Sequence, residues 1–174
     1  GDDFEDANAI GWSPAGFTSW AVVHNGSSYI YEQDDLTGNA ASYAGDSNWT
    51  DQVVQMDLKI TDSADNNNRW AGPVARYHDE NNYYYLTVRE SDTIELKKLE
   101  EGSVVLLDSA SFQFNFDTFY DVKLEVIGET INGYINGDLV LEAQDIGSSL
   151  DEGKMGVRMY KAAVEIDEVL VTIP

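Results

Sequence analysis

Hydrophobic and polar residues alternate with a period of two along most of this chain. The stretch 53–61 shows the pattern most clearly, with Met56, Leu58 and Ile60 separated by polar residues. Successive side chains of a strand point to opposite faces, so each such stretch predicts a strand with one buried face. We expect strands at 19–23, 29–33, 39–44, 53–61, 70–78, 83–90, 93–99, 104–107, 119–127, 130–135, 139–142, 153–160 and 163–173.

Turn signals separate these stretches, and the pattern holds no long amphipathic helix. Asn25-Gly26 and Asn136-Gly137 are dipeptides typical of tight hairpin turns, and 14–16 (Pro-Ala-Gly) also reads as a turn. Many short strands with one apolar and one polar face are what two stacked antiparallel sheets require. The sequence therefore predicts an all-β sandwich, and 174 residues without a linker or repeat predict a single domain over 1–174.

The chain is strongly acidic, with 32 Asp and Glu residues against 10 Lys and Arg and a net charge of −22. This charge repels nucleic acids and anionic bilayers. No apolar run reaches the roughly 18 residues that a membrane span needs, so we expect neither nucleic acid nor membrane as a partner. The acids are spread along the chain, which fits a solvated surface in salty water, a few calcium ligands, or both.

The chain contains no cysteine and two histidines, which is too few for a zinc cluster. No disulfide can hold it, which is compatible with a bacterial secreted protein. The chain starts at Gly1 without a signal peptide, so we expect a mature fragment or a domain excised from a longer, secreted protein.

The hairpin 70–90 carries the clearest candidate binding surface. Its second strand has one apolar face, formed by Tyr84, Leu86 and Val88. The opposite face is aromatic, hydroxylated and cationic, and consists of Tyr83, Tyr85, Thr87 and Arg89. Flat aromatic rings suit the apolar side of a sugar ring, and planar polar groups suit its hydroxyls. The alternative is that tyrosine is simply a good strand residue.

A set of short motifs along the chain resembles a known family. In order, they are Asp3-Phe4-Glu5-Asp6 with Gly11-Trp12, Asn48-Trp49-Thr50-Asp51, Val74-Ala75-Arg76-Tyr77, Asn81-Asn82-Tyr83-Tyr84-Tyr85-Leu86, Tyr120-Asp121-Val122-Lys123-Leu124-Glu125-Val126, Gly133-Tyr134-Ile135-Asn136-Gly137, Gly153-Lys154-Met155-Gly156-Val157 and Glu165-Ile166-Asp167-Glu168-Val169. This ordered set covers nearly the whole chain. It resembles the concanavalin A-like, or laminin-G-like, jelly-roll domains attached to bacterial polysaccharide lyases, pectate lyases among them, and to glycoside hydrolases.

The resemblance implies a jelly-roll β-sandwich that works as a non-catalytic carbohydrate-binding module. It implies a polysaccharide partner of plant or algal origin, a covalently linked catalytic domain, secretion, and a monomeric state. Two alternatives stay open. One is a structural or adhesion domain of a cell-surface protein. The other is an enzyme. A jelly-roll hydrolase is suggested because Glu165-Ile166-Asp167-Glu168 resembles the start of a Glu-x-Asp-x-x-Glu glycosidase motif, although Leu170 replaces the third acid. A jelly-roll lyase needs a positioned base, for which His78 with Tyr85 and Arg76 is the candidate set.

The candidate carbohydrate-binding residues are those at strand positions that point away from the core. They are Arg76, Tyr83, Tyr85, Arg89, Arg158 and Tyr160. Three of the four arginines of the chain fall in these strands, although the protein is acidic. An arginine fork can grip a uronate carboxylate or bridge two sugar hydroxyls. The alternative is that these arginines pair with outward acids of neighbouring strands, such as Asp57 and Glu95.

The two ends of the chain suggest a structural calcium site. Acids cluster near the first strand, and Asp167 lies in the last, and the first and last strands of a jelly roll usually lie side by side. Hard oxygen ligands from both ends suit Ca²⁺. Related jelly-roll proteins carry a structural calcium at a comparable place, which predicts the ligand set Asp3, Glu5, Gly45 and Asp167. The alternative is an acidic surface without a metal.

Overall fold

The computed structural model describes residues 1–16, 19–64 and 68–174. These residues form fourteen strands and no helix, so no described segment could cross a membrane as a helix. The strands are β1 (Ser13–Gly16), β2 (Ala21–His24), β3 (Tyr29–Gln33), β4 (Asn39–Ala44), β5 (Gln52–Ser63), β6 (Trp70–Asp79), β7 (Asn82–Arg89), β8 (Thr93–Glu100), β9 (Ser103–Ser111), β10 (Tyr120–Ile127), β11 (Thr130–Ile135), β12 (Asp138–Gln144), β13 (Lys154–Tyr160) and β14 (Ala162–Thr172).

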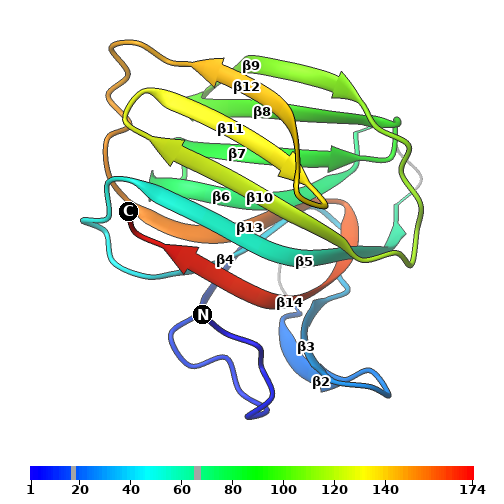
Figure 1. The fold of residues 1–174 in the computed structure, drawn as a ribbon. Helices are drawn as coiled ribbons and strands as arrows, with labels where there is room; N and C mark the ends of the chain where they lie inside the picture. The colour runs from blue at the N-terminus through cyan, green and yellow to red at the C-terminus, as the bar shows by residue number, and fades with distance from the viewer. Residues whose placement is uncertain (17–18, 65–67) are drawn as a thin grey trace.

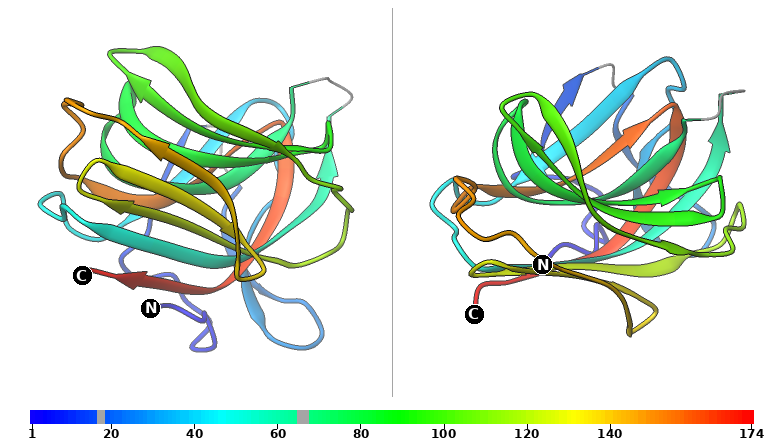
Figure 2. Two further views of the ribbon diagram at one scale, coloured as in Figure 1. Left: turned by 45° about the horizontal axis from the view of Figure 1, so that its top comes forward. Right: turned by 90° about the horizontal axis from the view of Figure 1, so that it is seen from above.

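The strands build two seven-stranded sheets that lie one over the other (Figures 1 and 2). The first sheet has the order β1-β4-β13-β6-β7-β8-β9, and the second has the order β12-β11-β10-β5-β14-β3-β2. Every strand pair described is antiparallel. The predicted all-β jelly-roll sandwich is therefore confirmed.

The core lies between the two sheets and follows the period-two pattern of the sequence. In β5 every second residue from Gln52 to Ile60 is buried, and Met56, Leu58 and Ile60 are among the most enclosed side chains. Tyr84, Leu86 and Val88 of β7 point into the same core, as their parity predicts. Each such apolar side chain contributes about 1.5–3 kcal/mol when it leaves water.

The segment 14–16 differs from the prediction of a turn. It belongs to the short edge strand β1, which pairs with β4 and places Ala15 opposite Ala41. Proline lacks a backbone N–H and is tolerated on an edge strand, where one row of backbone groups has no partner. This strand forms one border of the first sheet and contributes to the candidate site described below.

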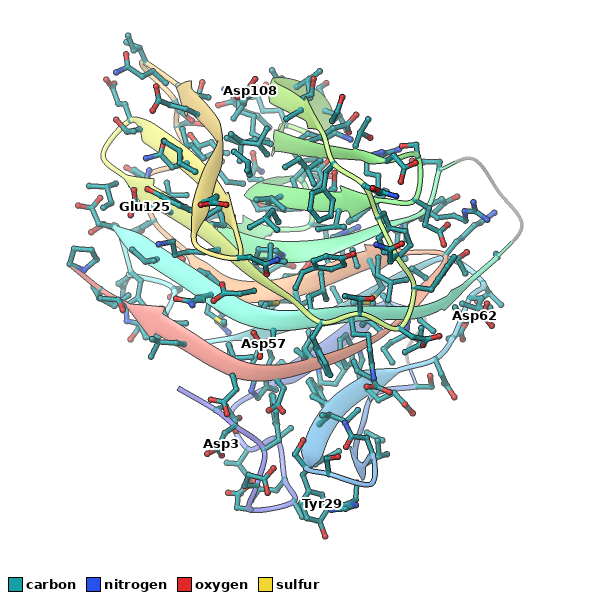
Figure 3. The ribbon with its side chains drawn as sticks, turned by 45° about the vertical axis from the view of Figure 1, so that its right-hand side comes forward. Asp3, Tyr29, Asp57, Asp62, Asp108 and Glu125 are labelled. Atoms are coloured by element: carbon teal, nitrogen blue, oxygen red, sulfur yellow. The ribbon has the colours of Figure 1, made fainter. Side chains whose placement is uncertain are left out.

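The N-terminal segment lies beside β14, so the two ends of the chain meet. Asp2 and Val169 exchange two backbone hydrogen bonds of 2.8 Å. The Glu5 carboxylate accepts a 2.9 Å hydrogen bond from the backbone N–H of Tyr29, which ties the segment to the β2–β3 hairpin. Figure 3 shows Asp3 in the N-terminal segment, below β14.

Candidate functional site

The outer face of the first sheet carries a second apolar cluster, separate from the core. Its buried members are Ala41, Tyr43, Trp70, Val74, Tyr83 and Tyr85, and its half-buried members are Tyr77, Leu99 and Tyr160. These residues alternate along β4, β6, β7 and β13 with residues of the main core. We call this surface, together with Arg158, the tyrosine face. An outward face that is mostly aromatic is unusual, because the outer faces of such sheets are ordinarily polar.

A stacked pair of rings forms the centre of the tyrosine face. The rings of Tyr43 on β4 and Tyr77 on β6 are parallel within 16°, with centroids 3.7 Å apart. Strand β13 runs between β4 and β6, so the two rings meet above it. Gly156 lies opposite Tyr43 in the β4–β13 pair, and a Cβ at Gly156 would collide with the Tyr43 ring. The glycine therefore lets the ring lie across β13.

Arg158 is the cation of this face. It projects from β13 between two small residues, Ala41 and Gly72, which are its partners on β4 and β6. Its guanidinium Nη1 donates a 3.3 Å hydrogen bond to the Tyr43 hydroxyl, and the guanidinium carbon lies 5.2 Å from the centroid of the Tyr83 ring. Contacts of a guanidinium with ring faces are favourable, and they hold the charge in place without neutralising it.

Arg158 differs from the other three arginines in its ion pairing. Arg69 pairs with Glu90, Arg76 with Asp51, and Arg89 with Glu95. Among the described residues, Arg158 has no carboxylate within ion-pairing distance. In a protein of net charge −22, this half-buried cation lacks the counter-charge that surrounds the rest of the molecule.

The phenols around Arg158 remain protonated at neutral pH. Burial raises the pKa of Tyr83 to about 12, and burial also raises the pKa values of Tyr43, Tyr77 and Tyr85. A phenol with such a pKa does not neutralise a neighbouring guanidinium and is a poor general base near neutral pH. The site therefore combines neutral hydroxyls with a guanidinium that has no carboxylate within ion-pairing distance among the described residues.

A hollow of about 190 Å³ opens beside the stacked rings and reaches Arg158. Its described lining comes from β1, β4, β6, β13 and the β6–β7 turn, and consists of Ala15, Gly16, Asn39, Ala40, Ala41, Tyr43, Tyr77, Glu80 and Arg158. The polar side chains are one guanidinium, one amide, two phenols and the exposed carboxylate of Glu80. Such a mixture of flat rings and few polar groups suits a small polyhydroxylated ligand.

The predicted residues Tyr83 and Tyr85 lie on the predicted face but are not exposed platforms. These residues are 3% and 5% exposed, respectively. Tyr77 and Arg158 lie against the Tyr83 ring, and Trp70 and Lys97 lie against the Tyr85 ring. The expectation that they offer open stacking surfaces is therefore wrong, and their rings form the floor of the face. Tyr160, also predicted, is half-buried on the same face, opposite Asn39 of β4.

The placement of Arg76 on this face is wrong. The β6–β7 register is interrupted between Ala75 and Asp79, and Arg76 has a left-handed backbone with φ of 48°. Such a bulge inserts a residue and shifts the parity of the rest of the strand. Ala75 still faces the core, Arg76 turns to the end of the sandwich, and Tyr77 takes the outward position on the tyrosine face.

The Arg76 guanidinium holds three loops together and is 6% exposed. It donates hydrogen bonds to the carbonyl of Thr50 at 2.7 Å and to those of Gly128 and Leu150 at 3.0 Å. It also pairs with the Asp51 carboxylate at 3.1 Å. These partners come from the segments before β5, after β10 and before β13, so Arg76 ties these three segments together.

Arg89 lies at the end of β7, away from the hollow. Its guanidinium forms an ion pair of 3.3 Å with Glu95 on β8, and donates a 2.7 Å hydrogen bond to Asn68. This is the cross-strand pairing that the sequence left open as the alternative for its arginines. Arg158 is thus the predicted arginine that the structure places within the hollow.

Sequence reasoning missed Tyr43, Tyr77, Asn39 and Glu80 as members of this site. In an uninterrupted strand, Tyr77 would point into the core. The bulge that turns it outward leaves no local signal in the sequence, because its left-handed position is occupied by Arg76 and not by a glycine. Tyr43 stands in a stretch of small residues, 39–44, that reads as a weak strand. The glycine at position 156, opposite Tyr43, is the signal that could have indicated a ring lying across β13.

The structure does not assemble the predicted calcium ligands into one set. In the described parts of the chain, no group of three or more carboxylate or histidine side chains is arranged to hold a metal ion. Asp167 accepts a hydrogen bond from the Ser28 hydroxyl at 3.3 Å, and Asp3 accepts one from the backbone N–H of Glu5 at 3.2 Å. Gly45 lies instead against the Trp49 ring. The described residues therefore show no preformed set of three such ligands, and calcium stays a prediction.

Comparison with solved structures identifies the fold. The carbohydrate-binding module CBM66 from Bacillus subtilis superposes with a TM-score of 0.78 at 22% identity, over 94% of this chain and 96% of the module. A Bacillus subtilis protein of unknown function with a galectin-like fold superposes with a TM-score of 0.70 at 14% identity, over 93% and 89%. The GH43 protein BlXynB from Bacillus licheniformis gives 0.74 at 15% identity, over 99% of this chain and 39% of that one.

No protein-family model and no curated protein sequence matches this chain. At the identities of the solved structures, the likeness shows the fold alone. The chain has the concanavalin A-like jelly-roll fold that the ordered motifs predicted. Proteins of this fold that superpose well on it include a carbohydrate-binding module and a galectin-like protein.

Proposed function

We propose that this protein is a non-catalytic carbohydrate-binding module whose ligand site is the hollow beside Arg158. The observation that carries the proposal is the position of the Arg158 guanidinium. It is fixed by the Tyr43 hydroxyl and the Tyr83 ring, faces a hollow, and has no carboxylate partner among the described residues. Sugar hydroxyls and ring oxygens are the acceptors that such a group lacks.

The shape of the hollow agrees with a sugar ligand. The half-buried ring of Tyr77 offers an apolar wall for one side of a pyranose or furanose ring. Asn39 and Glu80 supply an amide and a carboxylate, with which ring hydroxyls can form hydrogen bonds as donors or acceptors. Carbohydrate-binding modules with this fold, such as the CBM66 module, support the proposal by likeness of fold.

The same geometry argues against catalysis at this place. Glycoside hydrolysis needs two carboxylates flanking the bond, and Glu80 is the carboxylate among the described lining residues of the hollow. The tyrosines beside Arg158 have raised pKa values and would be poor bases. The Glu165-Ile166-Asp167-Glu168 segment lies on β14 of the other sheet, away from this hollow. We therefore propose that the module delivers a separate, covalently linked enzyme to a polysaccharide outside the cell.

Affinity electrophoresis against soluble polysaccharides tests the proposal. The polysaccharides are pectin, alginate, xylan, β-glucan, levan and agar. The proteins compared are the wild type, Arg158→Gln, and Lys123→Gln, which is a matched control on the second sheet. We expect retardation of the wild type and of Lys123→Gln by one or two polysaccharides, and at least tenfold weaker retardation of Arg158→Gln. No retardation by any polysaccharide would overturn the binding function. Release of sugar on long incubation would overturn the non-catalytic part.

A further inference from the structure

The uncompensated charge of Arg158 bears on the chemical class of the sugar. Hydroxyl groups can accept hydrogen bonds from a guanidinium, but they leave its charge unpaired. Charges that are partly buried are ordinarily paired, because removal from water is costly for an isolated ion. Each of the other arginines meets this requirement with a carboxylate of the protein itself. Among the described residues, Arg158 has no such carboxylate within ion-pairing distance, so the ligand is the candidate source of the anion.

A carboxylate is the anion that the guanidinium fits best in this setting. Its two oxygens match two N–H groups of the planar fork, so that charge and direction are satisfied together. One edge of the fork, at Nη1, is held by Tyr43, which fixes the orientation of the plane. Ala41 and Gly72 flank the arginine on both neighbouring strands, so no large side chain at its paired positions blocks approach from outside the sheet.

The size and lining of the hollow indicate what carries that carboxylate. Its volume of about 190 Å³ lies below the roughly 300–1,000 Å³ of pockets for drug-sized ligands, so it holds a single small ring. The Tyr77 ring and the Asn39 amide suit the faces and hydroxyls of a sugar ring better than an apolar acid. A hexuronate combines the carboxylate, the small ring and the hydroxyls in one sugar unit.

We infer that the site recognises a uronic acid residue, whose carboxylate binds the Arg158 guanidinium and whose ring lies against Tyr77. This inference rests on the proposed function and narrows its substrate class to acidic polysaccharides. It assigns Glu80 a second role, as the rim charge that limits affinity for the anion, because this exposed carboxylate lines the same hollow.

The overall charge of −22 opposes the approach of a polyanion but does not cancel the local attraction. At physiological salt, exposed charges are screened beyond about 8 Å. A direct pair between the half-buried Arg158 and a bound carboxylate is screened much less. Measurements at physiological salt therefore separate the contact at Arg158 from the repulsion of the whole molecule.

The test compares matched sugars that differ only at C6. Methyl glycosides of glucuronate, galacturonate and mannuronate are titrated by NMR or calorimetry at physiological salt, beside the methyl glycosides of glucose, galactose and mannose and the methyl esters of the uronates. We expect at least one uronate to bind tenfold or more tightly than its neutral partner and its ester. We expect Arg158→Lys, which keeps the charge but loses the fork, to lose much of that preference. We expect Glu80→Gln to raise the ratio of uronate affinity to neutral-sugar affinity about threefold.

The outcomes separate this inference from the proposed function. Equal or tighter binding of a neutral sugar, still lost in Arg158→Gln, overturns uronate recognition and leaves the carbohydrate-binding function in place. No binding of any sugar here, together with no retardation by any polysaccharide, overturns both. Uronate binding that survives Arg158→Gln in a variant with an unchanged melting curve overturns the assignment of the carboxylate to Arg158.

Discussion

The hydroxyl of Tyr43 accepts a 3.3 Å hydrogen bond from Nη1 of Arg158, and this contact joins two neighbouring strands of the first sheet across its outer face. The same Tyr43 ring stacks on Tyr77 from the strand on the other side of β13. One tyrosine therefore positions both the cation and the aromatic wall of the hollow.

Tyr43→Phe separates these two contributions. The variant keeps the ring and its stack on Tyr77 but removes the hydroxyl that orients Arg158. We expect carbohydrate binding to weaken about fivefold to tenfold, and the free energy of unfolding to fall by roughly 1 kcal/mol, as for loss of one hydrogen bond. Affinity electrophoresis and urea unfolding measure the two effects. Tyr134→Phe on the second sheet is the control, and equal binding by Tyr43→Phe and wild type would contradict the orienting role.

Gly156→Ala tests the space that the Tyr43 ring needs. A methyl group at this position collides with the ring and with the backbone carbonyl of Ser42, so the ring must leave its stack on Tyr77 and the strands must separate. We expect a loss of roughly 1–3 kcal/mol of stability, typical of overpacking, together with loss of binding. Urea unfolding and affinity electrophoresis again report both. A variant that keeps wild-type stability and binding would show that the stacked geometry is not required.

Arg76→Met should destabilise the fold without acting at the hollow. The variant leaves the carbonyls of Thr50, Gly128 and Leu150 without their donor, and an unsatisfied buried acceptor costs about 1–3 kcal/mol. Water reaches some of these groups, so we expect a total loss of about 3 kcal/mol in urea unfolding. Lys123→Met, which loses a single contact of a lysine with a tyrosine ring, should lose less than about 1 kcal/mol. Equal losses in the two variants would contradict the structural role of Arg76.

The pH dependence of stability should reflect a row of three acids on the second sheet. Asp57 on β5 lies directly opposite Asp121 on β10 and Asp167 on β14, and Figure 3 shows Asp57 on this sheet. Burial first, and then the charges of Asp121 and Asp167, raise the pKa of Asp57. The folded protein therefore takes up a proton at Asp57 before the unfolded chain does. This contribution to the free energy of unfolding increases as pH falls from 7 towards about 4.

Asp57→Asn measures this effect. The amide removes the central charge of the row, so at pH 7 we expect a gain of roughly 0.5–1 kcal/mol, the size of a cross-strand charge interaction. Between pH 7 and pH 5 the wild type should gain more stability than the variant. Urea unfolding at both pH values gives the comparison, and an equal pH response of the two proteins would contradict the role of Asp57.

Thermal unfolding with and without a chelator tests the predicted structural calcium site. Burial raises the pKa of Asp167, and Glu5 and Asp3 raise it further, so a bound cation would relieve repulsion at this end of the chain. The sequence prediction expects the melting temperature to fall by several degrees when a chelator is added to the protein as purified, and to recover with excess calcium. Asp167→Asn should remove the response. An unchanged melt, with no metal in elemental analysis, would contradict the calcium prediction.

Much of the fold can be predicted from the sequence alone because its signals are local. The alternation in β5 and β7 predicts which side chains enter the core, since strand side chains change face at every residue. The same rule predicts the outward face of Tyr83, Tyr85, Arg158 and Tyr160. Ordered motifs along the chain predict the concanavalin A-like sandwich, which the solved structures bear out.

The site itself depends on contacts between segments that are distant in the chain. The bulge at Arg76 is held by groups from three loops, and it decides that Tyr77 faces outward in its place. The strand order β4-β13-β6 brings Tyr43 and Tyr77 together above Gly156. By itself, the sequence determined which residues face outward in the uninterrupted strands, because that is a matter of neighbouring positions. Only the tertiary structure decided which arginine has no carboxylate within ion-pairing distance among the described residues, because ion pairing depends on which strands become neighbours.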